Sequence, residues 1–526
     1  MAPTDGLLPL PREAQTDAAN LASTALLNCL IREVARPACA GAFLLPATDR
    51  LLRVAGGRFP DRAEQRTPDG WRPLSLDDLV ALTAAELRAG TGVDNVTLPA
   101  EITHSRDVMA ALLAARRAAT PPPDLYLRSE QALVAGHRYH PAPKARGGSG
   151  PGAWLPYSPE AYASFALPLL GVPAGQLVEA GEAGALDRLG PPPGDGLALL
   201  PAHPWQIELL GGPPLRHVGV TRVLASPTSS IRTVYLPELD LFCKFSLDVR
   251  ITNDIRRLWL RDLSRLAVVA DVVGQAFDDL PDHVARPAVL RDRGYRSAEL
   301  DRDGGEALAV IVRDGLREHV RPGLTVLLAA GISEGFPGNP LDGLGEELAL
   351  VWWERYLDHV VPPLLHAYFR HGVVLECHLQ NVLIAVDERG LPAQAVFRDH
   401  EGVKLVAERH PSLKGVGGAR AWERLVYCLV TNNLCEIAGA LAERHPGLRG
   451  ELWARARTVF TGCGKDHGDP DELRDLLAAP HIPAKANLLL RWLNAGGGDT
   501  RAVPVPNPLA QWPTRWGRIA GWPGGV

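Results

Sequence analysis

The spacing of apolar residues changes along this chain at a run of three prolines, residues 121–123, and this change limits the folds that the chain can adopt. Before the prolines, residues 12–39 and 76–118 carry apolar side chains at helical spacing. From 125 to 305 the apolar segments are short and interrupted by Pro and Gly, which is typical of strands and turns. The sequence therefore predicts a mainly helical N-terminal part followed by a mixed part that is rich in strands.

A β-hairpin is predicted within the mixed part. Residues 231–236 and 241–247 are rich in β-forming side chains, and the turn-like residues 237–240 separate them. Helical spacing follows over residues 255–269. We therefore expect a hairpin that leads into a helix.

The last third of the chain begins with long helical patterns. Residues 346–369 and 421–444 carry apolar side chains at helical spacing. Between them, residues 382–386 and 395–398 form a second candidate hairpin across a turn at 387–390. This part is predicted to be mostly helical, with one hairpin between its long helices.

Length, charge and cysteine usage exclude several classes of protein. The 526 residues exceed one ordinary domain, so we expect two or three packed domains. The formal net charge is -5 with no long basic stretch, and no run of about 18 apolar residues or signal pattern occurs. We expect no nucleic acid or membrane partner and a cytoplasmic location. The seven scattered cysteines never form Cys-x-x-Cys, which argues against a disulfide framework and a thiolate zinc site.

Three cations recur at intervals of twelve residues: Arg232, Lys244 and Arg256. In the predicted structure Arg232 and Lys244 lie on adjacent strands and Arg256 opens the following helix, so the three can converge. A polyphosphate suits an Arg fork and a Lys point charge. The alternative is that they are unrelated charges on a solvated face. The polar residues near them are Ser229, Ser230, Thr233, Thr252 and Asn253.

Hard oxygen donors flank the second predicted hairpin. Glu376 and Asn381 precede it, and Asp399 follows it. Protein kinases hold magnesium through a loop Asn and a later Asp in a similar layout. The pattern indicates an ATP-magnesium site. The alternative is a loop of mutually satisfied polar groups, although such groups are costly on an apolar background.

A glycine-rich loop carries a third cluster of imidazoles and cations. Its members are His137, Arg138, His140, Lys144 and Arg146. Such a loop can cap an anion, and a structural role is equally open. In the string at residues 203–206, Trp205 is expected in the core and His203 in a hydrogen bond. The absence of G-x-x-x-x-G-K-[ST], G-x-S-x-G and H-E-x-x-H motifs excludes P-loop, serine-hydrolase and zincin functions.

Taken in order, these motifs resemble the IucA/IucC family of siderophore synthetases, which work independently of nonribosomal peptide synthetases. The likeness spans about residues 125 to 402 and weakens outside them, where Lys485 and residues 507–509 resemble family positions. The residues that carry it are Gly136, His137, His140, Pro141, Lys144, Arg146, residues 203–206, 230–233, Lys244, residues 251–253, Arg256, residues 376–381, Arg398 and Asp399.

The resemblance implies an α+β fold with a three-part, cupped-hand architecture. Residues 1–124 would form a helical thumb, and 125–305 a strand-containing fingers region that binds the ATP phosphates. Residues 306–526 would form a mostly helical, kinase-like palm that binds magnesium and the carboxylate substrate. The change in apolar spacing agrees with this division, and the resemblance also implies a homodimer.

The resemblance further implies a role for each site residue. ATP would contact Ser230, Arg232, Thr233, Lys244, Arg256, His140, Lys144 and Arg146. Magnesium would be held by Glu376, Asn381 and Asp399. The carboxylate substrate would face Thr252, Asn253, Arg256, His378, Gln380 and Lys485. Of these, Arg256, Lys244 and His378 are the candidate catalytic residues.

The implied reaction joins a polycarboxylate such as citrate to an amine or hydroxyl. A carboxylate attacks the α-phosphorus of ATP, and cations and magnesium offset the charge that builds there. Pyrophosphate leaves, the second substrate attacks the acyl-adenylate, and AMP is released. His378 either helps to deprotonate the incoming ammonium or binds the substrate carboxylate.

Two other functions remain open at this point. A small-molecule kinase fits the Glu376, Asn381 and Asp399 pattern, although kinases place an Asp base where this chain has Glu376. Release of ADP would identify a kinase. A non-catalytic binding protein for citrate or a ferric chelate would not bind nucleotide.

Overall fold

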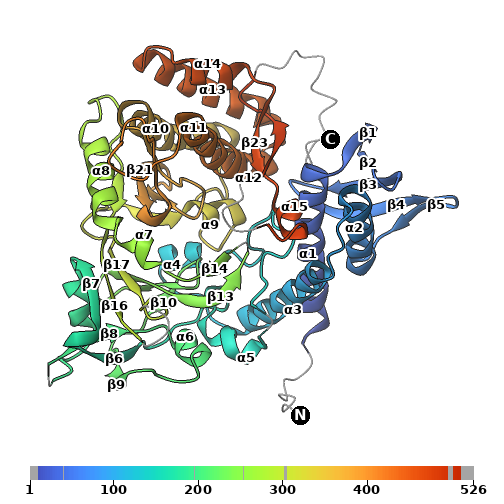
Figure 1. The fold of residues 1–526 in the computed structure, drawn as a ribbon. Helices are drawn as coiled ribbons and strands as arrows, with labels where there is room; N and C mark the ends of the chain where they lie inside the picture. The colour runs from blue at the N-terminus through green and yellow to red at the C-terminus, as the bar shows by residue number, and fades with distance from the viewer. Residues whose placement is uncertain are drawn as a thin grey trace, which may run out of the picture.

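The computed structural model describes residues 10–39, 41–147, 149–194, 196–252, 254–300, 305–495 and 501–510. The candidate substrate residue Asn253 lies outside the described residues. Helices and strands are both abundant, which confirms the predicted α+β class. Figure 1 shows the N-terminal elements on the right, the strands β6 to β9 at the lower left and the helices α10 to α14 at the top.

The N-terminal part contains three long helices and a sheet that the apolar spacing did not predict. Helix α1 (Arg12–Glu33) packs against α3 (Thr97–Ala118) and α2 (Leu76–Thr91), and five antiparallel strands connect α1 to α2. The strands are β1 Arg36–Cys39, β2 Ala42–Leu45, β3 Arg50–Gly56, β4 Pro60–Thr67 and β5 Gly70–Pro73. The expectation of helix over 12–39 is wrong after Glu33, because Pro37 has no backbone N–H for a helix and disfavours helical geometry in the residue before it.

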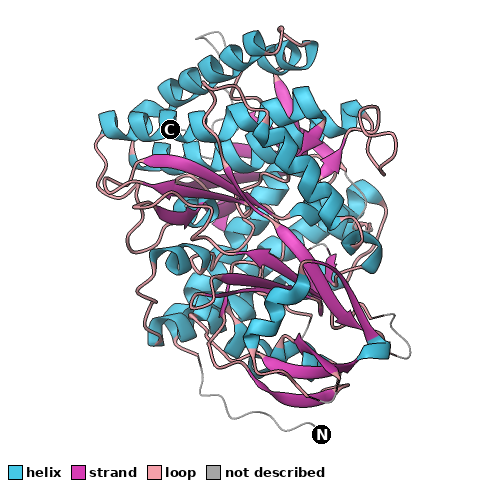
Figure 2. Ribbon diagram, turned by 90° about the vertical axis from the view of Figure 1, so that its left-hand side faces the viewer, coloured by secondary structure: helices cyan, strands magenta, loops and turns pink. Residues whose placement is uncertain are grey.

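Two antiparallel sheets make up most of the middle of the chain, as the short apolar segments predicted. One has the order β8-β6-β9 and the other the order β10-β11-β12-β17-β16-β7. Figure 2 shows these strands in the middle and lower parts of the molecule, with helices above them. The bounds are β6 Pro168–Pro173, β7 Leu177–Gly181, β8 Leu197–Pro201, β9 Arg216–Val220, β10 Ser226–Pro227, β11 Thr233–Leu236, β12 Leu241–Phe245, β16 Asp292–Ala298 and β17 Val310–Asp314.

The first predicted hairpin is confirmed, but the helix predicted after it is wrong in its first half. Strands β11 and β12 pair with Thr233 opposite Lys244. The chain then forms a second hairpin, β13 (Leu247–Ile251) and β14 (Asp254–Arg256), before α7 (Leu260–Leu263) and α8 (Leu266–Asp278). Thr252 has a left-handed φ of 60° that reverses the chain. Arg256 therefore ends a strand and does not open a helix.

The C-terminal part follows the prediction closely. Helix α10 (Glu346–His371) precedes a hairpin of β20 (Val382–Val386) and β21 (Pro392–Arg398). A continuous helical segment follows, made of α11, a π-helical stretch and α12. These strands form a sheet in the order β15-β21-β20-β18. The remaining bounds are β15 Ala288–Leu290, β18 Thr325–Leu328, α11 Gly418–Val426, the π-helix Tyr427–Leu434, α12 Cys435–Arg444, α13 Arg449–Asp466 and α14 Asp471–Ala478.

The segment Gly418–Arg444 is also long and apolar enough to cross a membrane. In the fold, 78% of its most apolar window is buried inside the protein. The hydrophobic core that contains this window also holds side chains of α10 and β20. Burial on all sides explains the apolar composition, as expected of a core helix.

The two ends of the described chain meet. Helix α15 (Asn487–Trp492) packs on α1, and Leu488 and Trp492 join the apolar core of the N-terminal helices. Glu33 accepts hydrogen bonds from the backbone N–H groups of Leu488 and Leu489, at 3.0 and 2.9 Å. Strand β23 (His481–Lys485) pairs with β24 (Ala502–Pro506) just before this contact.

Short elements complete the described fold. They are α4 Leu125–Glu130, α5 Pro151–Trp154, α6 Pro204–Leu209, α9 Ala329–Glu334, β19 Val373–Val374 and β22 Lys404–Leu405. Helix α6 and its N-cap confirm the predictions of a core position for Trp205 and a hydrogen bond for His203. Trp205 is buried, and His203 caps the helix by accepting a hydrogen bond from the Trp205 backbone N–H at 3.2 Å.

Candidate active site

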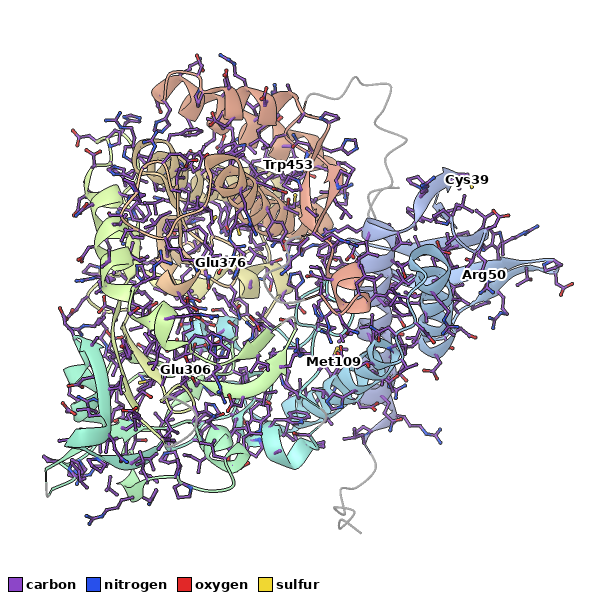
Figure 3. The ribbon with its side chains drawn as sticks, in the orientation of Figure 1. Cys39, Arg50, Met109, Glu306, Glu376 and Trp453 are labelled. Atoms are coloured by element: carbon purple, nitrogen blue, oxygen red, sulfur yellow. The ribbon has the colours of Figure 1, made fainter. Side chains whose placement is uncertain are left out.

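One cavity of about 860 Å³ collects every described residue that the sequence singled out for binding or catalysis. In Figure 3 the labelled Glu376 lies between the upper helices and the strands below them. The cavity is lined by the predicted residues His140, Lys144, Arg146, Ser230, Arg232, Thr233, Lys244, Thr252, Arg256, Glu376, His378, Gln380, Asn381, Asp399 and Lys485. The structure therefore brings together groups that lie up to several hundred positions apart in the chain.

The three cations at twelve-residue intervals do converge, although their supporting elements differ from the prediction. Arg232 precedes β11, Lys244 lies on β12 and Arg256 ends β14. Arg232 donates a hydrogen bond of 3.0 Å to the backbone carbonyl of Arg256. The two hairpins thus hold two guanidinium groups side by side at the cavity wall.

Arg256 is a half-buried cation that is fixed by neutral oxygens. Its Nη2 donates to the carbonyl of Ile251 at 2.9 Å and to Oγ1 of Thr252 at 2.8 Å. Burial, and then the nearby charge of Arg232, lower the pKa of Arg256 to about 10. The side chain therefore stays charged at neutral pH. The two hydrogen bonds orient it, and because both acceptors are uncharged oxygens its positive charge remains available to a ligand.

Lys244 is held by two carboxylates. Its Nζ lies 2.6 Å from Oδ1 of Asp399 and 2.7 Å from Oε2 of Glu401. Glu401 also lies 3.7 Å from Arg232. Glu401 is a site residue that the sequence did not predict, although it stands two positions after Asp399. It joins the strand cations to the end of the C-terminal hairpin.

Asp399 is held in the ionised form and in an unusual backbone geometry. Burial alone would raise its pKa, but the charges of Lys244 and Arg313 hold the pKa well below the usual range. Arg313, on β17, lies 3.3 Å from Asp399 and 2.6 Å from the buried Asp292. The φ of Asp399 is 80°, a conformation that non-glycine residues rarely adopt.

Backbone strain recurs around the cavity. Ile231 has a φ of 63° and Thr252 a φ of 60°, and both have branched Cβ atoms that disfavour left-handed geometry. Together with Asp399, they place strained backbone at each of the three turns that present charged groups. Such strain costs about 1–3 kcal/mol per residue and persists where the surrounding structure enforces it.

Glu376 is held at the cavity by a cation and by close packing. Its carboxylate pairs with Arg424 on α11, a partner that the sequence did not indicate. Gly402 packs against this carboxylate so closely that an added Cβ would overlap Oε2. The loop after Asp399 therefore needs glycine at this position.

The backbone of the second hairpin fixes Asn381 and its neighbours. The backbone N–H of Asn381 donates to the carbonyl of His378 at 2.9 Å, and its carbonyl accepts from the N–H of Arg398 at 3.2 Å. The Gln380 amide donates to Oγ of Ser229 at 3.3 Å. These bonds link the magnesium candidates of the C-terminal part to the hydroxyl-rich turn before Arg232.

His378 and Lys485 are basic groups of the cavity whose pKa values are lowered by their surroundings. Burial is the main cause that lowers the pKa of each. Neighbouring Arg424 lowers the pKa of Lys485 further. The lowered pKa favours the neutral imidazole of His378, which keeps one ring nitrogen as a hydrogen-bond acceptor.

The glycine-rich loop contributes buried cations that share one acid. Lys144 and Arg146 both pair with Glu160, a carboxylate that the sequence did not predict. Burial is the main cause that lowers the pKa of Lys144. His140 accepts a hydrogen bond from the Ala142 backbone N–H through Nδ1 at 3.1 Å. The loop therefore presents two positive charges for one negative charge.

A buried ion pair supports the turn that carries Ser230. Arg398 lies 2.5 Å from Oε1 of Glu130, and both side chains are buried. Oε2 of Glu130 accepts a hydrogen bond from the Ser229 backbone N–H at 3.1 Å. The distance along the chain between Glu130 and Arg398 explains why the sequence gave no sign of this contact.

Comparison with known proteins places the chain in a family. The sequence model of the IucA / IucC family matches residues 125–333, and the model described as ferric iron reductase FhuF-like transporter matches residues 350–500. The L-2,3-diaminopropanoate–citrate ligase of Staphylococcus aureus is 29% identical over 440 residues, which cover 73% of this chain and 75% of that protein. The spermidine-citrate ligase of Bacillus anthracis is 27% identical, over 60% of this chain and 57% of that protein.

Solved structures share the fold. The ATP-bound aerobactin synthetase IucA of Klebsiella pneumoniae superposes with a TM-score of 0.78 at 21% identity, covering 94% of this chain and 100% of that chain. The petrobactin biosynthesis protein AsbB of Bacillus anthracis gives 0.75 at 17% identity, covering 94% and 96%. The fold and the relatives define an enzyme of the ligase class. The chain belongs to the IucA/IucC family of siderophore synthetases, which confirms the resemblance seen in the motifs.

Proposed function

We propose that this enzyme adenylates a carboxylate of citrate or a related polycarboxylate and condenses it with an amine or hydroxyl, releasing AMP and pyrophosphate. The observation that carries the proposal is the convergence of three cations, two of them buried, with three hard oxygen donors in one cavity. Relatives named as ligases of citrate with diaminopropanoate and with spermidine support the substrate class. The shared fold of the ATP-bound aerobactin synthetase IucA supports ATP as the nucleotide. The product would serve siderophore or related specialised metabolism in the cytoplasm.

The ion pairs of the cavity suit an exchange of partners on binding MgATP. Lys244 and Arg232 are paired with Asp399 and Glu401, so the protein neutralises its own charges in this state. The ATP phosphates would replace the carboxylates as partners of the cations. Asp399 and Glu401 would then be free to pair with the magnesium ion of MgATP. In this way no buried charge would be left without a partner.

The donor set fits magnesium. Glu376, Asn381 and Asp399 offer only oxygen atoms, which are the ligands that Mg²⁺ prefers, and all three line the cavity. Bound Mg²⁺ would offset negative charge on the phosphates and stabilise the charge that develops during transfer. Before magnesium binds, Glu376 pairs with Arg424 and Asp399 pairs with Lys244, so each carboxylate already has a cationic partner.

The substrate carboxylate is proposed to bind near Arg256, Thr252 and His378, with Asn253, Gln380 and Lys485 close by. Arg256 is fixed by Thr252, so its charge is in place before the substrate arrives. A substrate oxygen attacks the α-phosphorus and pyrophosphate leaves. The amine then attacks the acyl carbon and displaces AMP. Neutral His378 accepts a proton from the incoming ammonium or hydrogen-bonds the substrate.

The ATP contacts proposed for the glycine-rich loop use its excess of positive charge. Lys144 and Arg146 share a single carboxylate, so an anion at the loop would restore the balance. His140 lies in the same loop and lines the same cavity. Ser230 and Thr233 are proposed to donate hydroxyl hydrogen bonds to the phosphates.

The proposed division into thumb (1–124), fingers (125–305) and palm (306–526) keeps the cavity at the junction of the last two parts. The six-stranded sheet continues to Asp314 through β17, so the second boundary crosses a sheet. The cupped-hand shape and a homodimer are proposed from the family resemblance. Light scattering on the purified protein tests the dimer.

The experiment that tests the proposal measures pyrophosphate release from ATP and Mg²⁺ with citrate, succinate or 2-oxoglutarate, using hydroxylamine as the amine. Wild type is compared with Arg256→Ala and with the matched control Arg257→Ala. Arg257 is the next residue, but its guanidinium binds Asp248 at 2.7 and 2.8 Å. We expect acid-dependent pyrophosphate and hydroxamate that Arg256→Ala loses and Arg257→Ala keeps. ADP as product would indicate a phosphotransferase, and no nucleotide turnover with any acid would contradict the ligase reaction.

A further inference from the structure

A cluster of two histidines and an aspartate lies outside the cavity, where the ends of α8 and α10 meet. Its members are Asp279, His366 and His371. One ligand atom from each lies within 4.8 Å of the others. Nε2 of His371 is 3.1 Å from Oδ2 of Asp279, and Nε2 of His366 is 3.9 Å from the same oxygen. None of these residues lines the cavity, so the proposed ligase reaction gives them no role.

His366 has a buried ring nitrogen, Nε2, that makes no hydrogen bond to the described residues. The residue is 4% exposed, and Nε2 has no hydrogen-bond partner among the described residues. A buried polar atom without a partner costs about 1–3 kcal/mol. A ligand placed between His366, His371 and Asp279 would remove this cost.

Three helix ends surround the cluster and favour a positive charge there. Asp279 caps the C-terminus of α8, and His371 is the last residue of α10. His467 caps the C-terminus of α13, and its ring centre lies 5.6 Å from that of His366. Helix C-termini carry partial negative charge, so their convergence stabilises a cation. Figure 1 shows these helices in the upper part of the molecule.

The charges nearest the cluster are compatible with a cation. Arg370 is positively charged but exposed, so its side chain can extend into solvent. Asp466 pairs with His283 at 3.3 Å and adds negative charge beside His467. Two further cations stand at the helix ends: Arg286 donates hydrogen bonds to the carbonyls of Phe277 and Asp278, and Arg409 to that of Arg370. Both guanidinium groups are engaged with backbone oxygens, whereas the ligand atoms of the cluster are side-chain atoms.

We propose that Asp279, His366 and His371 bind a divalent transition-metal ion of the zinc type, which joins α8 to α10. Two imidazoles and one carboxylate are ligands that Zn²⁺ accepts, whereas Mg²⁺ prefers oxygen alone. Tetrahedral Zn²⁺ at about 2.0–2.1 Å from each ligand separates the ligand atoms by about 3.3 Å. The observed distances need only a small closure, which the half-exposed His371 and the exposed Asp279 can supply. The fourth position is open to water.

The test is a Zn²⁺ titration of the full chain with any histidine tag removed. Excess Mg²⁺ is present to occupy the oxygen-lined cavity, and the buffer contains no chelator. We expect one equivalent of Zn²⁺ at micromolar concentration, together with a rise in Tm because the ion binds only the folded state. His371→Gln and Asp279→Asn should each weaken Zn²⁺ binding by at least about tenfold and abolish the rise in Tm. The exposed His217→Gln, on β9, is the matched control and should behave as wild type.

Three outcomes would overturn the site. The first is no Zn²⁺ binding by the wild type. The second is unchanged binding in His371→Gln and Asp279→Asn, both of which change side chains at least partly exposed to solvent and are expected to fold. The third is loss of the bound equivalent in Asp399→Asn, which would place the ion in the cavity. His366→Gln serves as a further variant where it folds.

Discussion

Two groups of buried cations line the same cavity, and they differ in how their charge is balanced. Lys244, Arg232 and Arg313 face the acids Asp399, Glu401 and Asp292, one acid for each cation. Lys144 and Arg146, in contrast, share Glu160 alone. The first group can exchange partners with a charged ligand, and the second holds a permanent excess of positive charge. Lysine and arginine thus form ion pairs that a ligand can replace in the first group, and ion pairs that stay in place in the second. We call these the exchangeable group and the fixed group.

Exposure of the acids follows the same distinction. The side chain of Glu160 is 2% exposed, whereas those of Asp399 and Glu401, the two acids paired with Lys244, are 23% and 21% exposed. Asp292, which pairs with Arg313, is 0% exposed and belongs with Glu160 in this respect. An acid that must give up its cation to a ligand needs access to the cavity. An acid that only neutralises its neighbours does not. Each prediction below tests one side of this difference.

The largest effect is expected from Glu160→Gln, which removes the single acid of the fixed group. Two buried cations would lose their counter-charge, so the free energy of unfolding should fall by about 3–5 kcal/mol. Urea denaturation measures the change. The control is Glu182→Gln, which breaks an exposed pair with Arg293 and should cost less than about 1 kcal/mol. Equal stability of the two variants would show that Lys144 and Arg146 do not depend on Glu160.

Lys244→Met tests the exchangeable group and should affect the reaction more than the fold. Asp399 keeps Arg313 and Glu401 keeps Arg232, so neither acid is left alone. The rate of pyrophosphate release should fall by about 10²–10³-fold, because a cation aimed at developing charge is lost. Lys465→Met, on the exposed surface of α13, is the control. A rate within a few-fold of wild type would remove Lys244 from the proposed catalytic residues.

A smaller effect, with a defined sign, is expected from Glu33, a half-buried acid without a cation in hydrogen-bond contact among the described residues. Burial raises its pKa from 4.5 to about 7, against the two backbone N–H groups of α15. The folded state therefore binds this proton more tightly than the unfolded state. The contribution of Glu33 to stability is greatest below pH 4.5 and decreases as the pH rises to about 7, by roughly 2–3 kcal/mol.

Urea unfolding of wild type and Glu33→Gln across this pH range measures the effect. The stability of wild type relative to the variant should decline as the pH rises. Glu130 and Glu160 have pKa values lowered by their cations, which outweigh burial, so their contributions change in the opposite direction, being lost as the pH falls. A difference between wild type and Glu33→Gln that does not vary with pH would contradict the raised pKa and would show that the backbone N–H groups offset burial completely.

The spacing of apolar residues predicted the hairpin β11–β12 that carries Lys244, but it did not predict the strand that carries Arg256. The turn at 237–240 and the β-rich residues on either side fixed the register that puts Thr233 opposite Lys244. Helical spacing after Ile255 hid the short strand β14, because the left-handed turn at Thr252 depends on pairing with β13. Tertiary pairing prevailed over local spacing at Arg256.

The N-terminal sheet was missed for a different reason. Strand β1 is exposed throughout and β5 is exposed or half-buried, so neither shows the alternation of apolar and polar residues that marks a half-buried strand. The charged residues of β3 and β4 look like a solvated loop in sequence. Only the pairing of all five strands makes them a sheet.

The sequence indicated which groups meet in the cavity, but not which groups hold them. The motifs around Arg232, Glu376 and Asp399 are compact, so their residue types and spacing are informative. Arg424, the partner of Glu376, stands in an ordinary segment, and so does Glu160, the partner of Lys144 and Arg146. In such segments nothing distinguishes a buried charge from a solvated one. Pairs between distant positions become visible only in the fold.

The contact of α15 with α1 has a consequence for how the protein is made. The apolar face of α1 is completed by Leu488 and Trp492, which the ribosome adds more than four hundred residues later. At about 5–20 residues per second, the newly made N-terminal helices wait tens of seconds with part of their apolar surface uncovered. Lys485 reaches the cavity wall by the same late event. A chain that stops short of α15 would therefore be both prone to aggregation and without a complete cavity.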